Sequence, residues 1–404
     1  MKKTFVFGLF AAAAVLQSCS SDEPGGNTPR RDIEVSRSEQ EVIDKHQEFA
    51  FTLFNKGLEN RGENVAYSPF SISTVLSMTA NGTEGEMQRE ILDALDFKST
   101  EQLDVMNSCA QLLLRELPTL DKSTTFMSSQ SVWTADGMTL NGGFRKACAD
   151  FYGASFGSYA TADDGATAIN EWVSRNTNGA IKDAVSPKDM GKIAIVNATY
   201  FKGQWMDQFK KENTRRLAFT NYDGSRDIVD MMSGSKDHYA YWDNDELQMA
   251  RLPYGNGSIS MYVVLPAEGK TAADVFAGMN REKWTQLKES MVPCTVNLKM
   301  PRFGFQTSND IKETLRRLGI NKLWDEATGA MTDSEVVMKK FLHNVRIIVD
   351  EEGTVAAASS SAIGGFLSPG PGEVVEMNCN RPFVCLIEEQ STGAILFIGA
   401  VNRL

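Results

Sequence analysis

The feature that most constrains this chain is an uncharged stretch near its C-terminus, from Gly353 to Ser368. It follows a segment rich in β-branched residues, Val345–Val349, and a short acidic segment, and it ends at Pro369. Composition alone is typical of a strand followed by a flexible linker, or of a short alanine-rich helix. Both interpretations leave the stretch without a function.

A sharper interpretation is that the stretch can itself become a strand. Alternate residues of a strand face one side of a sheet. One side here would carry seven residues: Thr354, Ala356, Ala358, Ser360, Ala362, Gly364 and Phe366. None is charged and all but the last are small, so the segment could enter a packed sheet without burying a charge. No proline interrupts it, so each residue keeps its backbone hydrogen-bond donor.

Several segments resemble the serpin family, in the order in which serpins have them. They are residues 64–73, 197–205, 351–358, 380–384 and 393–401. The segment 351–358 is similar to the hinge of the serpin reactive loop, and the last two are similar to the motif that follows the loop. The resemblance covers about residues 38–404.

Mixed helical and strand periodicity, without a regular βαβ order or internal repeat, predicts only an α+β protein. The resemblance implies more: a single serpin-fold domain at 37–404, with three β-sheets and eight to nine helices. It also implies an exposed reactive-centre loop at about 351–376.

The resemblance assigns two groups of site residues. The hinge would comprise Glu351, Gly353, Thr354, Ala356, Ala357 and Ala358. The shutter and breach, which control how easily the central strands part, would comprise Ser68, Ser71, Asn197, Trp205 and His343. Hydroxyl and amide groups of this second group could satisfy a buried imidazole. A buried histidine and a core tryptophan are the plain structural alternatives.

The implied activity is suicide inhibition of a protease. The protease would cleave the loop, form an acyl-enzyme, and be trapped when the loop inserts into the central sheet. Counting from Gly353 places the cut between Leu367 and Ser368, with cleavage after Phe366 as the alternative. A leucine favours serine proteases of the chymotrypsin, cathepsin G, elastase or subtilisin kind, with papain-like cysteine proteases as further candidates.

Catalytic motifs are scarce, so we expect no enzyme activity. The chain has 3 histidines, and an H-E-x-x-H or Walker motif does not occur. A hydrolase built on His343 and Cys379 or Cys385 is a minor alternative. A serpin-fold protein that only binds a partner, or is cut as a plain substrate, is the main alternative. No metal site and no cofactor are expected.

The N-terminus predicts export and lipidation. A positive start and an apolar stretch, Phe5–Leu16, are typical of a signal peptide over residues 1–18. Leu16-Gln17-Ser18-Cys19 resembles a bacterial lipobox, which would make Cys19 the lipidated first residue of a tether at 19–36. We therefore expect a membrane partner through the lipid. The expected location is the bacterial outer membrane, facing the cell surface or the periplasm, with possible extracellular release.

Charge and cysteine content limit the partners. A net charge of −11 argues against nucleic acid or heparin, and we expect a monomer. Five cysteines remain after Cys19, and an odd number cannot all pair. We expect most of them to be reduced and buried among apolar neighbours, behaving as small hydrophobic residues.

Local signals predict several elements. Ser38 is expected to open a helix with a capping box, and Ser68 with Pro69 to open another. We further expect a strand at Ile193–Phe201 and helices at Asp164–Asn176 and Ser308–Leu318.

Overall fold

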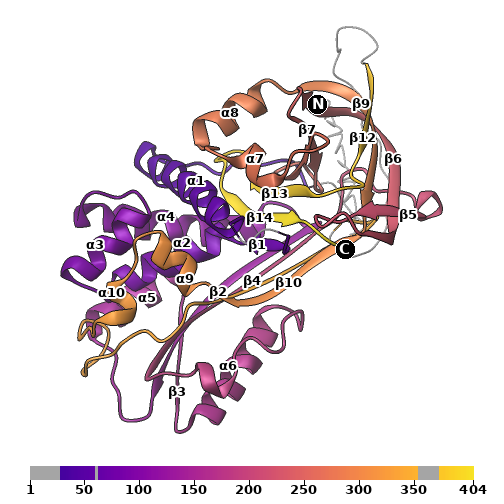
Figure 1. Ribbon diagram of the computed structural model, residues 1–404. Coiled ribbons are helices and arrows are strands. Elements are labelled where there is room, and N and C mark those ends of the chain that lie inside the picture. Colours follow the sequence, from indigo (N-terminus) through magenta and orange to yellow (C-terminus); the bar gives the residue numbers. More distant parts are fainter. Residues whose placement is uncertain (1–27, 60–61, 354–372) are drawn as a thin grey trace, which may run out of the picture.

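A computed structural model describes residues 28–59, 62–353 and 373–404 (Figure 1). The predicted lipidation site, the predicted cut and the hinge residues after Gly353 lie outside the described residues. These are Cys19, Thr354, Ala356, Ala357, Ala358, Phe366, Leu367 and Ser368.

Ten α-helices occur in the described part of the chain. They are α1 (Arg37–Gly57), α2 (Pro69–Ala80), α3 (Gly85–Ala94), α4 (Leu103–Glu116), α5 (Gly142–Tyr152), α6 (Ala162–Asn176), α7 (Ala272–Phe276), α8 (Arg281–Glu289), α9 (Lys312–Arg317) and α10 (Lys322–Asp325). Short 3-10 turns lie at Thr100–Gln102, Leu117–Thr119, Pro187–Asp189 and Lys211–Asn213.

One sheet has nine strands, in the order β1-β14-β13-β8-β7-β6-β9-β12, with β5 paired to β6. The bounds are β1 (Val65–Tyr67), β5 (Arg215–Thr220), β6 (Arg226–Asp243), β7 (Leu247–Pro253), β8 (Ile259–Pro266), β9 (Val292–Pro301), β12 (Val374–Asn378), β13 (Phe383–Glu389) and β14 (Ile395–Val401). Every residue of β8, β13 and β14 is buried. These strands are continuous apolar runs, as expected for strands covered on both faces.

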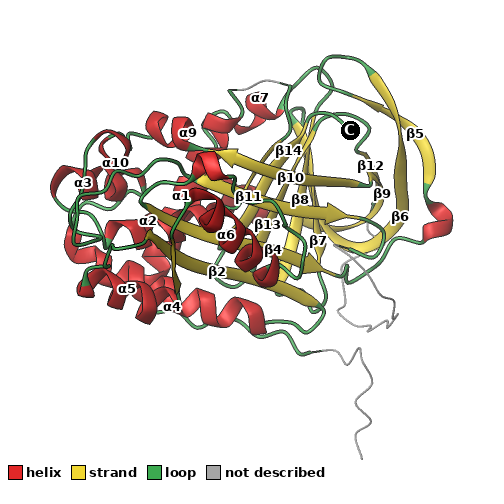
Figure 2. Cartoon of the chain, turned by 90° about the horizontal axis from the view of Figure 1, so that it is seen from below, coloured by secondary structure: helices red, strands yellow, loops and turns green. Residues whose placement is uncertain are grey.

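The second sheet has five strands in the order β10-β11-β4-β2-β3. The bounds are β2 (Thr124–Ala135), β3 (Ser155–Tyr159), β4 (Ile193–Gly203), β10 (Phe303–Asp310) and β11 (Leu342–Val349). Helix α6 lies across one face of this sheet, as the two views of Figures 1 and 2 agree. The strand predicted at Ile193–Phe201 is confirmed as β4.

Most helices gather at one end of the molecule, next to α1 and α2 (Figure 2). Every residue of α2 is buried, because it runs through the centre of the main hydrophobic cluster. Ser68 caps α2, its hydroxyl accepting from the Ser71 N–H, and Pro69 occupies the first turn. This helix start was predicted and is confirmed.

The α+β fold class is confirmed, but two counts differ from expectation. Within the described ranges the strands form two hydrogen-bonded sheets, not three, because the 18 residues of β6 pair with β5, β9 and β7 in turn. A bulge between Lys236 and Tyr239 redirects the strand on the way. Ten helices replace eight to nine because short segments such as α10, with 4 residues, also close helical turns.

Two predicted helix starts were wrong. The capping box that opens α1 uses Ser36 and Glu39, not Ser38, although Ser38 lies within hydrogen-bond distance of Ser36. The helix expected at Ser308–Leu318 begins at Lys312, because the residues before it continue β10 in register with β11. Tertiary strand pairing overrides local helix propensity there. The helix expected at Asp164–Asn176 is confirmed as α6.

Part of the segment assigned to the tether lies against the body. Ile33 is buried, and its N–H donates to the Ser391 hydroxyl at 2.9 Å. Arg31 forms an ion pair with Glu116. No helix of the described residues has both the length and the apolar content needed to cross a membrane.

Candidate functional site

The boundary between β4 and β11, here called the seam, is the weakest line in the five-stranded sheet. The two strands are parallel, and in the described residues they pair only where Val345 faces Thr199 and Arg346 faces Tyr200. Their outer neighbours pair along their whole lengths: β2 follows β4, and β10 follows β11. The upper part of the seam therefore lacks the ladder found elsewhere in the sheet.

The chain reverses at the top of the seam, in a turn that we call the hinge turn, Asp350–Gly353. The Asp350 N–H donates to the Gly353 carbonyl at 2.8 Å, and the Gly353 N–H returns a bond at 3.3 Å. Gly353 also forms an antiparallel bridge with Gln204, the residue after β4. It thus lies between the ends of β4 and β11 and runs antiparallel to β4. A strand that filled the seam would start at this position.

Only glycine fits at position 353. Its φ is 132°, and a Cβ there would lie 2.1 Å from the Gly203 carbonyl oxygen and 2.7 Å from the Trp205 nitrogen. Side chains rarely adopt this backbone conformation and could not tolerate this contact. The predicted hinge glycine is therefore required by the close approach of two backbones.

The connection after β4 binds the hinge turn through its backbone. The Trp205 N–H donates to the Glu352 carbonyl at 2.9 Å, and the Trp205 indole N–H donates to the Asp350 carbonyl at 2.9 Å. The Phe209 N–H donates to the Glu351 carbonyl at 2.9 Å. The Trp205 ring stacks on Tyr254 with centroids 4.4 Å apart, which fixes the indole beneath the turn.

Glu351 is a buried carboxylate with a bidentate partner. The Arg302 Nε donates to both its oxygens at 2.9 and 2.8 Å, and the Arg302 Nη2 donates at 2.6 Å. The Thr214 hydroxyl is a further donor. Burial would raise the pKa of Glu351, but Arg302 and Thr214 outweigh it and hold the pKa below its usual value. Glu351 is therefore ionised at neutral pH and anchors the hinge turn.

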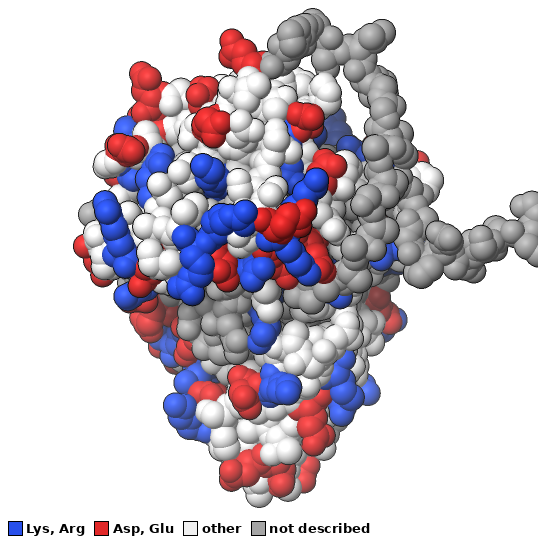
Figure 3. All heavy atoms as spheres, turned by 90° about the vertical axis from the view of Figure 1, so that its right-hand side faces the viewer, with Lys and Arg blue, Asp and Glu red and all other residues white. Residues whose placement is uncertain are grey.

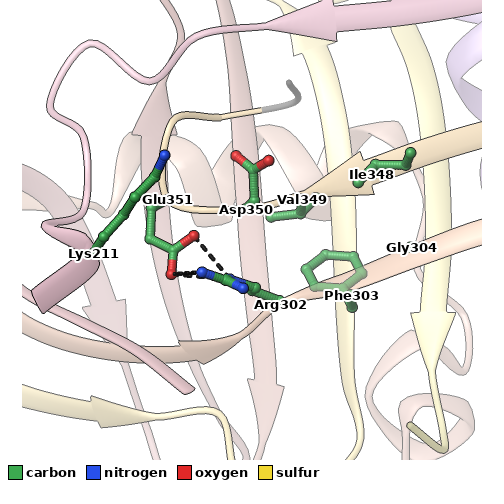
Figure 4. A pocket seen from close by; sticks show the side chains of 8 residues that line it. All are labelled: Lys211, Arg302, Phe303, Gly304, Ile348, Val349, Asp350 and Glu351. Carbon is green, nitrogen blue, oxygen red and sulfur yellow. Dashed lines mark hydrogen bonds and ion pairs between the residues drawn. The ribbon is translucent and has the colours of Figure 1, made fainter. Parts of the chain in front are cut away.

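Glu351 and Arg302 also line a hollow of about 560 Å3 beside the hinge turn. Figure 4 shows Glu351 pointing to Arg302, while the Asp350 carboxylate points away from it. Lys211 reaches the hinge from the connection between β4 and β5 and forms an ion pair with Glu352. On this side of the molecule, which carries β5 and β6, charges of both signs lie next to one another (Figure 3). Solvent-exposed pairs of this kind contribute little by themselves.

A second polar group lies deeper, beneath the seam. His343 of β11 is buried, and its Nε2 accepts a hydrogen bond from the Ser68 backbone N–H at 2.9 Å. The predicted partner was right but the atom was not, because the Ser68 hydroxyl is used to cap α2. The imidazole also stacks on Tyr67, with centroids 6.2 Å apart.

Ser71 and Asn197 extend this group across the seam. The Ser71 hydroxyl donates to the Asn197 side-chain oxygen, which also accepts from the Thr199 hydroxyl at 2.6 Å. The Asn197 amide donates to Ser128 at 3.1 Å. The polar group thus links α2 with β4 and β2 on one side and with β11 on the other. The predicted shutter residues are brought together, while Trp205 lies apart from them at the top of the seam.

Burial lowers the pKa of His343 to about 3. The imidazole is therefore neutral, which leaves Nε2 free to accept the Ser68 N–H. Burial also raises the pKa of the Cys379 and Cys385 thiols to about 12. A neutral thiol is a poor nucleophile and a histidine with such a low pKa is a poor base, so this geometry does not favour a hydrolase.

The five cysteines of the described part are free and buried, as predicted: Cys109, Cys148, Cys294, Cys379 and Cys385. The sequence analysis missed several residues that hold the site. Arg302, Thr214 and Tyr254 lie far from the hinge in the sequence, and no local motif marks them. A buried glutamate needs a cationic partner, but which arginine supplies it depends on which strands are neighbours, and the sequence alone does not give the strand order.

Comparisons with known proteins agree with this geometry. A family model described as Serpin (serine protease inhibitor) matches residues 44–404. Human neuroserpin is 30% identical over 84% of this chain and 86% of its own length. Human Serpin B8 is 29% identical over 87% of this chain and 96% of its own.

Solved structures show the same fold. Tengpin, a thermophilic serpin crystallised in its native state, matches with a TM-score of 0.80 and 25% identity over 94% of this chain and 97% of its own. Human thyroxine-binding globulin in complex with thyroxine matches with a TM-score of 0.80 and 24% identity, over 91% of this chain and 99% of its own. The family match over almost the whole folded part, with the seam and hinge in place, shows that the chain belongs to the serpin family.

Proposed function

We propose that this serpin inhibits a protease by inserting its cleaved loop into the seam. One observation carries the proposal: Gly353 already bridges the end of β4, next to a seam whose upper part is unpaired. The residues that follow, 354–372, contain no charged side chain. Nothing in this segment would oppose entry between the two strands by burying a charge.

The driving force is the hydrogen bonding that the uncleaved sheet lacks. Strand β4 has 11 residues, and a new strand of that length would bond to β4 on one side and β11 on the other. At about 0.5–1.5 kcal/mol net for each hydrogen bond, insertion gains on the order of 10 kcal/mol. The intact loop cannot reach this state easily because both of its ends are held, at Gly353 and at β12. Cleavage frees one end.

The proposed cut is the Leu367–Ser368 bond, with Phe366 as the alternative P1 residue. An apolar residue fits the pocket of chymotrypsin-like, cathepsin G-like, elastase-like or subtilisin-like serine proteases, and papain-like cysteine proteases are secondary targets. The role is that of an inhibitor and not of a catalyst.

The proposal is tested by incubating the purified protein with chymotrypsin and with pancreatic elastase. We expect a complex that survives SDS and a released C-terminal peptide whose mass identifies the cut. Clean cleavage without a complex would instead indicate a substrate or a binding protein on the same fold.

Charge substitutions in the loop sharpen this test. In an inserted strand Ala356 and Ala357 face opposite sides of the sheet. If the even-numbered residues face the core, Ala356→Arg would bury a charge at a cost of several kcal/mol, and complex formation should fall at least about tenfold. Ala357→Arg is the matched control and should retain most inhibition. Equal inhibition by both variants would argue against insertion.

We further propose that Cys19 carries the lipid of a bacterial outer-membrane lipoprotein, so that the inhibitor acts at the cell surface or in the periplasm. The lipobox-like sequence before Cys19 supports this. Metabolic labelling with a radioactive fatty acid should mark the native chain but not Cys19→Ala. Labelling of both proteins, or of neither, would exclude this anchor.

A further inference from the structure

Two lysines cross the seam at the end opposite to the hinge turn. Lys339 and Lys340 come just before β11, and Lys188–Met190 come just before β4. Lys340 Nζ lies 2.6 Å from an oxygen of Asp189. Lys339 Nζ donates to the carbonyls of Lys188 at 2.8 Å and Met190 at 2.9 Å. Together they make three contacts between the starts of the two strands.

The segment with Asp189 belongs to the part of the molecule that contains α6. Met190 packs in the small hydrophobic cluster beneath α6, apart from the main core. Asn170 of α6 accepts from the N–H groups of Ala184 and Val185 at 2.8 and 2.9 Å. The Asp189 carboxylate accepts from the Ser186 N–H at 2.9 Å. This connection is therefore held to α6, β4 and β2.

Lys339 and Lys340 are attached to the opposite side of the seam, the side formed by β10 and β11. The next residue, Phe341, is buried, and its carbonyl accepts from the Ile311 N–H at 3.0 Å. Its own N–H donates to the Asp310 carboxylate at 3.2 Å. Asp310 ends β10 and Ile311 precedes α9, so Lys339 and Lys340 are held to β10 and β11. Their contacts with Lys188–Met190 thus join the two parts that must separate for a strand to enter.

Insertion along the full seam is incompatible with these contacts. A strand between β4 and β11 moves the two apart by one strand spacing, about 4.8 Å. An ion pair of 2.6 Å and two short bonds from one ammonium group cannot all persist through such a movement. Insertion over only the upper seam leaves them intact, because they lie beyond Ile193, the first residue of β4. The contacts therefore oppose the last stage of insertion.

We propose that Lys339 and Lys340 form a latch with Lys188–Met190 that keeps the lower end of the seam closed until the loop is almost fully inserted. The inference rests on the proposed function, because it assigns these lysines a positioning role in loop insertion. In the intact protein the latch guards against premature opening of the sheet. In the inhibitory reaction it slows the final movement of the protease.

Both members of the ion pair are charged at neutral pH. Burial would raise the pKa of Asp189, but bonds from Lys340 and Ser186 outweigh it and lower the pKa to about 2. The hydrogen bond to Asp189 raises the pKa of Lys340. The ion pair of the latch therefore keeps its charges at every pH between the lowered pKa of Asp189 and the raised pKa of Lys340.

The test compares melting of the uncleaved protein and of the loop-clipped protein, for wild type, Lys340→Met and Lys339→Met. Each variant should melt about 1 °C lower than wild type when uncleaved and at the same temperature when clipped, because insertion has already broken the latch. Lys340→Arg should restore the uncleaved value. Lys182→Met, an exposed lysine of the same connection, is the control and should change neither form.

The outcomes separate the latch from the proposed function. If the clipped wild type is no more stable than the intact one, loop insertion fails and the latch with it. If clipping stabilises the wild type but the variants shift both forms equally, or neither form, only the latch is overturned. As a second readout, the Lys339→Met/Lys340→Met double variant should complete loop insertion about twofold faster than the wild type after cleavage, followed by the change in tryptophan fluorescence with time. An unchanged or lower rate would contradict the latch.

Discussion

The two sheets of this protein differ in how their central strands are held. In the nine-stranded sheet β13 pairs antiparallel with β14 and β8 along almost its whole length, and all three strands are buried throughout. In the five-stranded sheet the central strands β4 and β11 are parallel and pair at two positions among the described residues. The first sheet is paired throughout its centre, whereas the proposed function requires the second to take up one more strand.

This difference implies an uneven distribution of stability. The nine-stranded sheet has no free place in its centre, so it is expected to be the same before and after loop cleavage. In the five-stranded sheet, β4 and β11 are paired with each other at only two described positions, so a further strand could form hydrogen bonds there. The polar groups around His343 and the ion pairs around Glu351 hold these central strands in place. The predictions below test this comparison.

Clipping the loop should have the largest effect, because it lets the missing strand form. For a domain of this size, a gain on the order of 10 kcal/mol corresponds to a rise in Tm of roughly 10–15 °C. The measurement is calorimetry of the protein before and after limited proteolysis, with the cut mapped by mass. Equal melting temperatures for the two forms would show that the second sheet is not short of a strand.

A cavity in the nine-stranded sheet should destabilise both forms alike. Leu386 lies in β13 and is fully buried, so Leu386→Ala should cost about 2–5 kcal/mol in the intact and in the clipped protein. Denaturant unfolding of both forms measures this. A large cost in only one form would show that the nine-stranded sheet also changes on insertion.

Removing the charge of Glu351 should weaken the intact form specifically. Glu351→Gln leaves Arg302 without its bidentate partner and should cost about 1–3 kcal/mol. The hinge turn would then open more easily, and the intact protein should convert faster to an inactive form on warming, measured as loss of complex formation with time. Glu352→Gln, which disrupts the pair with Lys211, is the matched control and should change stability by less than about 1 kcal/mol.

Mild acid should have the smallest effect of the four. Burial lowers the pKa of His343 from 6.5 to about 3, so its contribution is complete above pH 6.5 and is lost as the pH falls towards 3. The loss is about 1 kcal/mol between pH 6.5 and 5.5. His343→Gln should flatten the dependence of Tm on pH.

His46 provides a comparison for the acid test. It lies in α1, away from the seam, and burial lowers its pKa to about 4. His46→Gln should also flatten the dependence of Tm on pH. Acid should in addition speed the loss of complex formation with time, because protonation of His343 weakens the seam. Only His343→Gln should remove this second effect. If both variants inactivate equally fast in acid, His343 has no special role at the seam.

Much of the fold could be predicted from local sequence. Ser68 and Pro69 marked the start of α2, and the apolar run at Ile193 marked β4, because capping and burial patterns act within a few residues. The start of α9 could not be predicted, because the residues before it pair with β11 and so extend β10. The length of β6 could not be predicted either, because it depends on pairing with three other strands, β5, β7 and β9.

What the sequence determined by itself is the character of the segment after Gly353: small, uncharged and free of proline. The sequence also carried the family resemblance, since whole motifs were retained. That position 353 requires glycine was decided by tertiary structure, through its close approach to the Gly203 carbonyl. Tertiary structure alone decided which strands border the seam, that Arg302 and Thr214 hold Glu351, and that the Ser68 backbone rather than its hydroxyl meets His343. These are contacts between residues tens to hundreds of positions apart. They arise from packing, and no local pattern encodes which partner a buried charge will find.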